Sequence, residues 1–342
     1  MSLSTLLPPS VRRPLVALSL LTLPFVHAEW VEHLGDAARA PRLTLATWNL
    51  EWLMTPQTQS NLLPRCRRQQ PGSDDRALPC TPGRALPPQR ERADHDALAR
   101  SAQTLREAHR VDVVALQEVD GPEAARLVFR QGWKLDCFNH RAHPQKNGFA
   151  IREGLPYRCN GDLDTLDIDG HTRAGADITL YPGTPQAVRL LNVHLKSGCF
   201  DGPLDRNFGP CGRLRQQVPV VEAWIDQRVR EGVAFAVLGD FNRHLDRDAR
   251  FDAGPDEQAP RNMLQAWSDD QPRGAILHRA TANQPYLACD ADDHHSRYID
   301  DILISERLAA RNKNRRFARL SYDPQDRGRQ LSDHCPLIWE LD

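Results

Sequence analysis

Polar residues lie at or beside the ends of a series of apolar, strand-like runs in this chain of 342 residues. They are acids, amides and imidazoles, namely Asn49, Glu118, His194, Asp240, Asn242, Asp300, Asp333 and His334. A carboxylate that follows several buried β residues is costly to desolvate unless it is paired or binds a cation. A single acid of this kind is typical of an ordinary strand end. Several acids together with two histidines instead predict one site at an edge of a sheet.

The run Gly239-Asp240-Phe241-Asn242 directly follows the apolar segment 233–238. The glycine permits a tight exit from a strand, and side chains two residues apart in an extended backbone point the same way. Asp240 could therefore accept a proton or bind a metal while Asn242 donates its amide to a phosphate oxygen. On its own the pattern is weak, because Asp and Asn are common in turns.

Two histidines accompany these acids. His194 lies in a strand-like run, on the face opposite its apolar neighbours, where a lone histidine is more often structural. Ser332-Asp333-His334 adds a second imidazole beside an acid. Asp300 or Asp301 would orient His334 by accepting its other ring N–H, the usual arrangement for a catalytic imidazole.

Alternating elements must position these residues. Apolar or alternating runs predict strands over residues 43–50, 112–119, 148–152, 174–181, 187–195, 233–238, 299–305 and 336–341. Helical spacing predicts helices over 92–110 and 213–230. Strands alternating with helices indicate an α/β layered domain. The Pro-, Arg- and Cys-containing stretch 55–90 is predicted to be an irregular insertion. No segment after residue 41 resembles a linker, so 29–342 is expected to be a single domain.

The first 28 residues are typical of a cleavable secretory signal. Arg12 and Arg13 precede an apolar run that ends before His27-Ala28. The run is short for a membrane span, and no other stretch is apolar enough for one. We therefore expect cleavage after Ala28 and a secreted or periplasmic protein; the alternative is an uncleaved anchor.

Eight cysteines in an exported chain predict disulfides rather than thiol chemistry. The simplest pairing joins sequence neighbours: Cys66–Cys80, Cys137–Cys159, Cys199–Cys211 and Cys289–Cys335. Cys335 directly follows His334, so a buried free thiol is the alternative there.

The balance of charge does not by itself favour a nucleic-acid binder, because the chain carries 44 basic and 45 acidic residues. Arginines are nevertheless concentrated in residues 65–92 and 311–319. These stretches are either solvated loops or phosphate-facing patches.

The motifs occur in the order seen in the endonuclease/exonuclease/phosphatase superfamily, which the chain resembles. They are Thr47-Trp48-Asn49-Leu50, Leu116-Gln117-Glu118-Val119, Asn192-Val193-His194-Leu195, Gly239-Asp240-Phe241-Asn242, Tyr298-Ile299-Asp300-Asp301 and Ser332-Asp333-His334. Members include pancreatic-type deoxyribonuclease, apurinic-site endonucleases, bacterial sphingomyelinases and inositol-polyphosphate phosphatases. The resemblance implies a deoxyribonuclease-I-like fold, a four-layered α/β/β/α sandwich of two packed mixed sheets.

The resemblance also implies roles for individual residues. Asn49, Glu118 and Asp333 would hold a metal, and Mg²⁺ or Mn²⁺ suits such oxygen ligands, with Ca²⁺ as an alternative. The catalytic residues would be His194, Asp240, Asn242, Asp300 and His334. The residues that bind the substrate phosphate would be Arg173, Asn242 and His194, with the Arg173 guanidinium acting as a clamp.

Three functions remain open at this point. We favour a secreted nuclease, expected to be monomeric, that cleaves DNA or RNA by metal-assisted attack of water and binds mainly backbone phosphate. The alternative is a sphingomyelinase-type lipid phosphodiesterase or a phosphomonoesterase. A non-catalytic binding protein is disfavoured, because binding alone would not need both histidines.

Two other features are open to more than one interpretation. The cluster Asp290, Asp292, Asp293, His294 and His295 is interpreted as a solvated loop, with a separate Ca²⁺ or zinc site as the alternative. The loop closed by Cys199 and Cys211 contains Phe200 and Phe208. It either contacts substrate or is a surface loop that the disulfide merely stabilises.

Overall fold

The computed structural model describes residues 42–68, 89–141, 143–205, 209–248, 250, 261–290, 293 and 295–342. These residues all belong to one compact unit, Ala40–Asp342. The predicted signal segment 1–28 lies outside the described residues. Among the described helices, none is long and apolar enough to cross a lipid bilayer.

The first sheet has six strands in the order β11-β12-β1-β2-β4-β3. Their bounds are β1 Leu43–Leu53, β2 Val113–Val119, β3 Trp133–Asp136, β4 Lys146–Arg152, β11 Arg315–Arg319 and β12 Leu337–Leu341. β1 and β2 are parallel, and the other pairs are antiparallel. The central strands consist of near-continuous buried apolar residues, as expected of strands covered on both faces.

The second sheet also has six strands, in the order β5-β6-β7-β8-β10-β9. Their bounds are β5 Tyr157–Leu163, β6 Gly175–Leu180, β7 Val188–His194, β8 Ala234–Asp240, β9 Leu277–Arg279 and β10 Asp300–Ser305. β7 and β8 are parallel within an otherwise antiparallel sheet. Both sheets are therefore mixed, as predicted.

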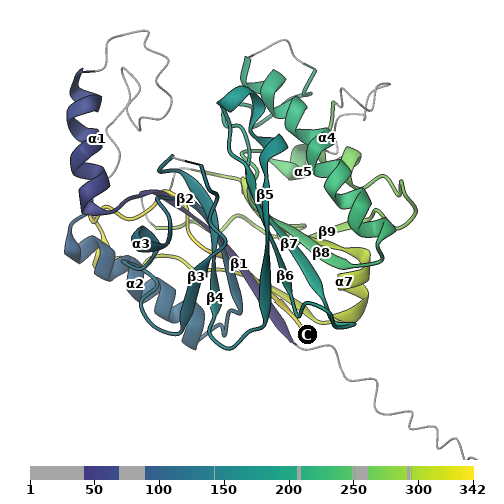
Figure 1. Ribbon diagram of the computed structural model, residues 1–342, viewed down its shortest axis with the longest axis horizontal. Coiled ribbons are helices and arrows are strands. Elements are labelled where there is room, and N and C mark those ends of the chain that lie inside the picture. Colours follow the sequence, from purple (N-terminus) through teal and green to yellow (C-terminus); the bar gives the residue numbers. More distant parts are fainter. Residues whose placement is uncertain are drawn as a thin grey trace, which may run out of the picture. The chain divides into compact units, whose positions relative to one another are not determined.

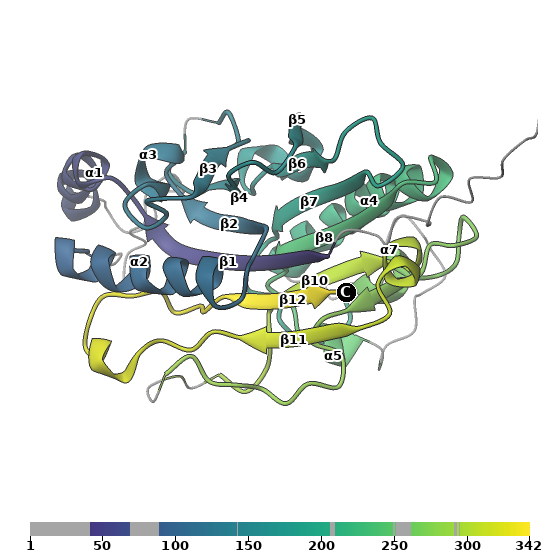
Figure 2. The ribbon, with the colours of Figure 1, turned by 90° about the horizontal axis from the view of Figure 1, so that it is seen from below.

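Helices cover the outer faces of the packed sheets (Figures 1 and 2). Their bounds are α1 Pro56–Arg68, α2 Arg92–Glu107, α3 Pro122–Ala125, α4 Gly209–Arg230, α5 Leu245–Asp248, α6 Met263–Trp267 and α7 Glu306–Arg311, with short 3₁₀ turns η1 Asp164–Leu166, η2 Ile168–Gly170 and η3 Pro324–Asp326. One apolar core lies between the sheets, a second joins the first sheet to α2 and α3, and a third joins the second sheet to α4 and α6. Three cores between four layers confirm the predicted α/β/β/α sandwich.

The prediction of an irregular stretch from residue 55 is wrong over its first part, where α1 forms. Pro56 is the first helical residue, a position that needs no N–H donor. The Thr55 hydroxyl accepts the backbone N–H of Thr58 at 3.1 Å and so caps the helix. Leu62 packs with Met54 in a small apolar cluster. The helix cap and the buried contact of Leu62 thus stabilise a helix in spite of the polar composition of this segment. Residues 69–88 of the predicted irregular stretch lie outside the described part of the chain.

Three of the four expected disulfides are present. They are Cys137–Cys159, Cys199–Cys211 and Cys289–Cys335. Cys335 is therefore not a free thiol. The pairing of Cys66 with Cys80 lies outside the described residues.

The arginine-rich stretch 311–319 comprises the last residue of α7, a short connection and strand β11. Arg319 is buried beneath the rings of Tyr286 and Tyr298, and Arg316 pairs with Glu340. Arg315 pairs with Leu341 at the end of β12 that lies away from His334. The interpretation as a solvated loop is wrong for residues 315–319, which form β11 with Arg315 and Arg316 exposed.

Candidate functional site

The strands that carry the predicted residues end side by side at one edge of the sandwich. In the second sheet, His194 pairs in register with Asp240, which in turn pairs with Asp300 on β10. The side-chain amide of Asn49, on β1 of the first sheet, donates to the Asp240 carboxylate across the interface at 3.1 Å. The parallel strands β7 and β8 both end at this edge and the antiparallel strand β10 begins there, so His194, Asp240 and Asp300 converge.

Two irregularities of the first sheet mark the same edge. The pairing of β1 with β2 shifts register around Glu51 and Trp52, and the pairing of β2 with β4 shifts at Glu118. The backbone φ angles are 44° at Glu51, 53° at Trp52 and 57° at Glu118, in a region that such residues rarely adopt. Backbone strain persists only where the surroundings enforce it, and it clusters at functional sites.

Asp240 lies at the centre of the site and is 2% exposed. Besides Asn49, its Oδ2 faces Nε2 of His194 at 3.4 Å and Nε2 of His334 at 4.0 Å. Burial, followed by repulsion from the Asp300 carboxylate, raises the pKa of Asp240 to about 7. A carboxyl group with such a pKa can exchange a proton near neutral pH, as a general base must.

His334 is paired with Asp300. The ring Nδ1 of His334 lies 2.7 Å from Oδ2 of Asp300. Burial alone would lower the pKa of His334, but the Asp300 carboxylate, aided by Asp240 and Asp333, raises it well above the usual 6.5. The imidazole is therefore charged at neutral pH.

The structure shows which of the neighbouring acids Asp300 and Asp301 orients the His334 imidazole. The Asp301 carboxylate points away from His334 and accepts from the guanidinium of Arg279 at 3.0 Å and the hydroxyl of Thr281 at 2.6 Å. Neighbouring residues of a strand face opposite sides of the sheet, so only one of the two can reach the imidazole. That residue is Asp300.

His194 differs from His334 in its surroundings. Its Nε2 lies 3.7 Å from Oε1 of Glu118, and its buried Nδ1 has no hydrogen-bond partner in the part of the chain that the structure describes. Burial, followed by the positive charges of Arg173 and His334, lowers the pKa of His194 well below 6.5. One histidine of the site is therefore neutral and the other charged, a division that the sequence left open.

The three residues expected to hold a metal lie at or beside this edge. One oxygen of Glu118 accepts the backbone N–H of Trp52 at 3.1 Å, and the other faces His194. The Asn49 side-chain oxygen accepts the backbone N–H of Glu51 at 2.9 Å, which leaves one lone pair. The Asp333 side chain is 58% exposed.

A second group of possible metal ligands also meets at this edge. The ligand atoms of Asp240, Asp300 and His334 lie within 4.8 Å of one another. The buried Oδ1 of Asp300 has no hydrogen-bond partner among the described residues. The two carboxylates suit a hard divalent cation, whereas the charged His334, paired through Nδ1 with Asp300, has no lone pair to offer one.

The two predicted phosphate-binding residues besides His194 reach the site differently. The Arg173 guanidinium donates to Oε1 of Gln145 at 2.7 Å. Burial lowers the pKa of Arg173, and the negative charges of Glu118 and Asp240 act in the opposite direction. The Asn242 side chain donates to the backbone carbonyl of Leu195 at 3.2 Å. Its backbone N–H donates to Oδ1 of Asp240 at 2.8 Å. The backbone of Asn242 therefore orients Asp240, while its side-chain NH2 group keeps a second N–H besides the one that it donates to Leu195.

The family model described as the endonuclease/exonuclease/phosphatase family matches residues 46–334, most of the chain and all of the converging residues. The chain belongs to this family. The resemblance inferred from the motifs is thereby confirmed. Comparison with curated protein sequences gave no match.

Solved structures of this family share the fold. Truncated TDP2 of Caenorhabditis elegans superimposes with a TM-score of 0.52 at 14% identity, over 89% of this chain and 98% of that one. The 3′-5′ exonuclease NExo of Neisseria meningitidis gives a TM-score of 0.51 at 18% identity, over 88% and 100%. Danio rerio TDP2 in complex with a single-strand DNA product gives 0.50 at 13%, over 88% and 99%. Identities this low show a common fold.

Glu51 was not predicted from the sequence, although it lies in the site of this family member. Its carboxylate accepts the backbone N–H of Asp333 at 3.2 Å. Burial, followed by repulsion from Asp333, raises the pKa of Glu51 to about 7. The spacing Asn49-x-Glu51 at a strand end repeats that of Asp240-x-Asn242, and this signal could have identified it.

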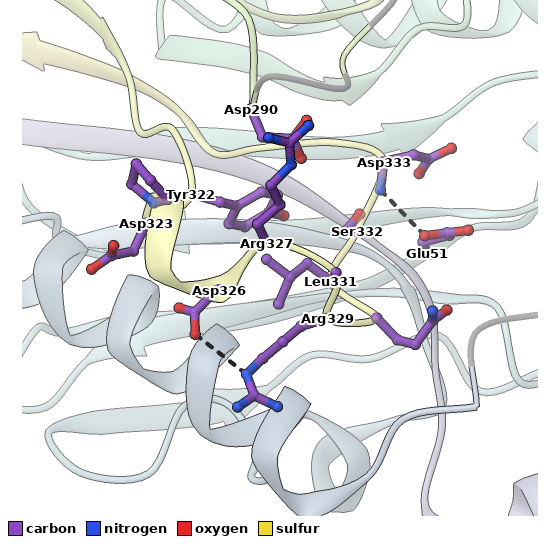
Figure 3. A pocket seen from close by; sticks show the side chains of 13 residues that line it. Glu51, Asp290, Tyr322, Asp323, Asp326, Arg327, Arg329, Leu331, Ser332 and Asp333 are labelled. Carbon is purple, nitrogen blue, oxygen red and sulfur yellow. Dashed lines mark hydrogen bonds and ion pairs between the residues drawn. The ribbon is translucent and has the colours of Figure 1, made fainter.

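A cavity of about 420 Å³ opens beside the Ser332-Asp333-His334 loop (Figure 3). Glu51, Ser332 and Asp333 form the part of its wall that borders the site. Its lining carries the acids Glu51, Asp290, Asp323, Asp326 and Asp333 and the arginines Arg327 and Arg329. The excess of carboxylates disfavours a phosphate group there.

The described residues of the Asp290–His295 cluster do not form a metal site. The Asp293 carboxylate accepts from the Tyr286 hydroxyl and the Cys289 N–H, both at 2.8 Å, and from the His295 N–H at 2.9 Å. It therefore holds the loop together, as the interpretation of a polar loop predicts. Asp292 and His294 lie outside the described part, as does Phe208. Phe200 is 41% exposed and packs on His244.

Replacing Asp293 with asparagine should destabilise the fold at neutral pH by roughly 1–3 kcal/mol. Burial would raise the pKa of Asp293, but its hydrogen bonds lower it to about 2. A depressed carboxyl pKa stabilises the folded state above the unfolded pKa and loses that effect as pH falls through the folded value. Urea unfolding should thus separate wild type from Asp293→Asn at neutral pH and bring them together near pH 2. A gap of constant size would contradict this.

Proposed function

We propose that this chain is an exported, metal-dependent phosphodiesterase that hydrolyses DNA or RNA. The observation that carries the proposal is the Asp240 carboxyl group held between a neutral His194 and a charged His334. Hydrolysis of a phosphate ester needs a base for water and a proton donor for the leaving oxygen. Asp240 can serve as the base and His334 as the proton donor, and the two groups lie 4.0 Å apart.

The proposed steps use this chain's own residues. Asp240, oriented by the amides of Asn49 and Asn242, takes a proton from the attacking water. His334, held charged by Asp300, donates a proton toward the leaving oxygen. His194 and Arg173 bind the non-bridging phosphate oxygens.

Glu118, with Asn49 and Asp333, would hold Mg²⁺ or Mn²⁺ on the accessible side of the site. A bound divalent cation neutralises the charge that develops on the phosphoryl oxygens. The side chains of Glu118 and His334 are 13% and 12% exposed, so substrate can reach this side.

Two observations support nucleic acid as the substrate and export as the destination. The Danio rerio structure of the same fold contains a single-strand DNA product, and the Neisseria meningitidis structure is a 3′-5′ exonuclease. Disulfides form in oxidising compartments, which agrees with the signal segment. A lipid phosphodiesterase would need a group of exposed aromatic side chains to enter the bilayer interface. Among the Phe and Trp residues that the structure describes, only Phe200 is exposed.

The proposal predicts that activity disappears when the metal or either central side chain is removed. The disulfide-intact protein should cleave plasmid DNA or RNA with Mg²⁺ or Mn²⁺, and lose this activity with EDTA. Asp240→Ala and His334→Ala should each lower kcat by at least about 100-fold. His278→Ala is a matched control, because His278 pairs with Glu306 at the opposite end of β10.

Sphingomyelin and inositol phosphates belong in the same assay. Turnover that survives both Asp240→Ala and His334→Ala would show that the site is wrongly assigned. Hydrolysis of sphingomyelin without cleavage of nucleic acid would replace the nuclease with a lipid phosphodiesterase.

A further inference from the structure

Arg90 lies just before α2, and its side chain is only 3% exposed. Its guanidinium donates to three backbone carbonyls. Nε donates to Gln330 at 2.9 Å, Nη1 to Glu51 at 2.8 Å, and Nη2 to Leu331. A planar guanidinium presents its donors in a rigid fork, so these contacts fix the relative positions of the groups that accept them.

The carbonyls belong to two segments that both enter the site. Glu51 lies in the strained bulge of β1, and Leu331 directly precedes Ser332-Asp333-His334. The Glu51 carboxylate, 3.8 Å from the Arg90 guanidinium, also accepts the N–H of Asp333 (Figure 3). Arg90 and Glu51 together therefore join the β1 bulge to the base of the loop.

The rest of the loop is fixed by the same strand. The Ser332 hydroxyl donates to the carbonyl of Asn49 at 2.8 Å, and the N–H of His334 donates to the Ser332 hydroxyl at 3.1 Å. These contacts follow Leu331, the residue that Arg90 holds. A shift at Leu331 would thus be passed on to the His334 ring, which stands 4.0 Å from Asp240.

A buried guanidinium is costly to desolvate, and here it faces one carboxylate at a distance of 3.8 Å. Most of the desolvation cost of the Arg90 guanidinium is offset by its hydrogen bonds to the backbone carbonyls of the two segments. An apolar side chain would fill the same space without that cost but would leave the carbonyls unpaired. The contacts of Arg90 thus serve the geometry of the two segments rather than simple packing.

We propose that Arg90 is a positioning residue, which holds the loop bearing Asp333 and His334 against the β1 bulge and thereby sets the place of the His334 imidazole. The inference rests on the proposed function of this site. It adds a residue from outside the family's motifs that sets how the site is assembled.

The test is Arg90→Lys in the full, disulfide-intact protein. Lysine keeps the charge but cannot donate to three separated carbonyls. We expect kcat on a single-stranded oligonucleotide with Mg²⁺ to fall by about 10- to 100-fold, with KM nearly unchanged. In metal-free, ¹⁵N-histidine-labelled protein, the ring resonances of His334 should shift.

Arg228→Lys is the matched control. Arg228 is buried near the end of α4 and pairs at 2.8 Å with Glu231, which directly follows the helix, away from the loop. It should match Arg90→Lys in any general loss of stability, yet leave the His334 resonances and KM and kcat as in wild type.

Unchanged His334 resonances and unchanged kcat in folded Arg90→Lys would overturn the proposal. Should Arg90→Lys not fold, Arg90→Met replaces it, because methionine fills the same space and leaves the three carbonyls unpaired, and unchanged His334 resonances there would overturn the proposal equally. The resonance measurement does not depend on turnover. If wild type hydrolyses none of the substrates, the proposed function fails while the positioning role is still tested.

Discussion

Asp300→Asn should lower kcat by about a thousand-fold while the protein remains folded. The Asp300 carboxylate lies 2.7 Å from Nδ1 of His334 and supplies the charge that keeps the imidazole protonated. Asparagine has a similar shape but no charge, so burial would then dominate and favour the neutral ring. Steady-state kinetics on an oligonucleotide, with circular dichroism to verify folding, measure the effect.

Asp301→Asn gives the opposite pattern and serves as the control. Asp301 follows Asp300 in the chain, but its carboxylate pairs with Arg279 and Thr281 instead of a site residue. Removing that charge should destabilise the fold while leaving kcat of the folded protein near wild type. If Asp300→Asn stays within a few-fold of wild type, or if Asp301→Asn has the larger effect on kcat, Asp300 does not hold His334.

Gly239→Ala should destabilise the fold by on the order of 4 kcal/mol, a large share of a domain's usual stability. Gly239 has a φ of 143°, and a Cβ atom there would lie 1.9 Å from the backbone oxygen of Val193. That oxygen belongs to the neighbouring strand β7, which cannot move without separating the paired His194 and Asp240. Urea unfolding should show the loss, and the surviving folded fraction should have reduced kcat.

Gly154→Ala separates the cost of a positive φ angle from the cost of a steric clash at the new Cβ atom. Gly154 also has a positive φ, 86°, but a Cβ atom there would meet nothing within 4 Å. It should therefore show only the cost of the backbone conformation, about 1 kcal/mol. Equal losses in the two variants would mean that the close approach of β7 to β8 does not constrain Gly239.

The elements predicted from the sequence are those with buried, patterned side chains. All eight predicted strands are present within a few residues of their expected bounds, as are the helices α2 and α4. The strands that were not predicted are β3, β5, β9 and β11, which form the four edges of the two sheets. Edge strands pair on one side only and carry more exposed residues, so they lack the long apolar runs that reveal interior strands.

The candidate site follows the same division. Asn49, Glu118, His194, Asp240, Asp300 and His334 were predicted because a polar residue at or beside the end of a buried strand is a local signal in the sequence. Glu51 and Arg90 were not predicted. The side chain of Glu51 is directed by a bulge, and Arg90 acts through backbone carbonyls far away in the chain. The spacing Asn49-x-Glu51 could have pointed to Glu51, but no local pattern encodes the contacts of Arg90.

The sequence by itself determined the family, the layered fold and the residues that meet at the sheet edge, since each is encoded in short motifs and in apolar periodicity. Only the tertiary structure decided that Asp300 rather than Asp301 holds His334, and that one histidine is neutral and the other charged. Those outcomes depend on distances between side chains and on burial in the assembled sandwich. Charge states are set by the neighbours that folding supplies, which the order of residues along the chain does not reveal.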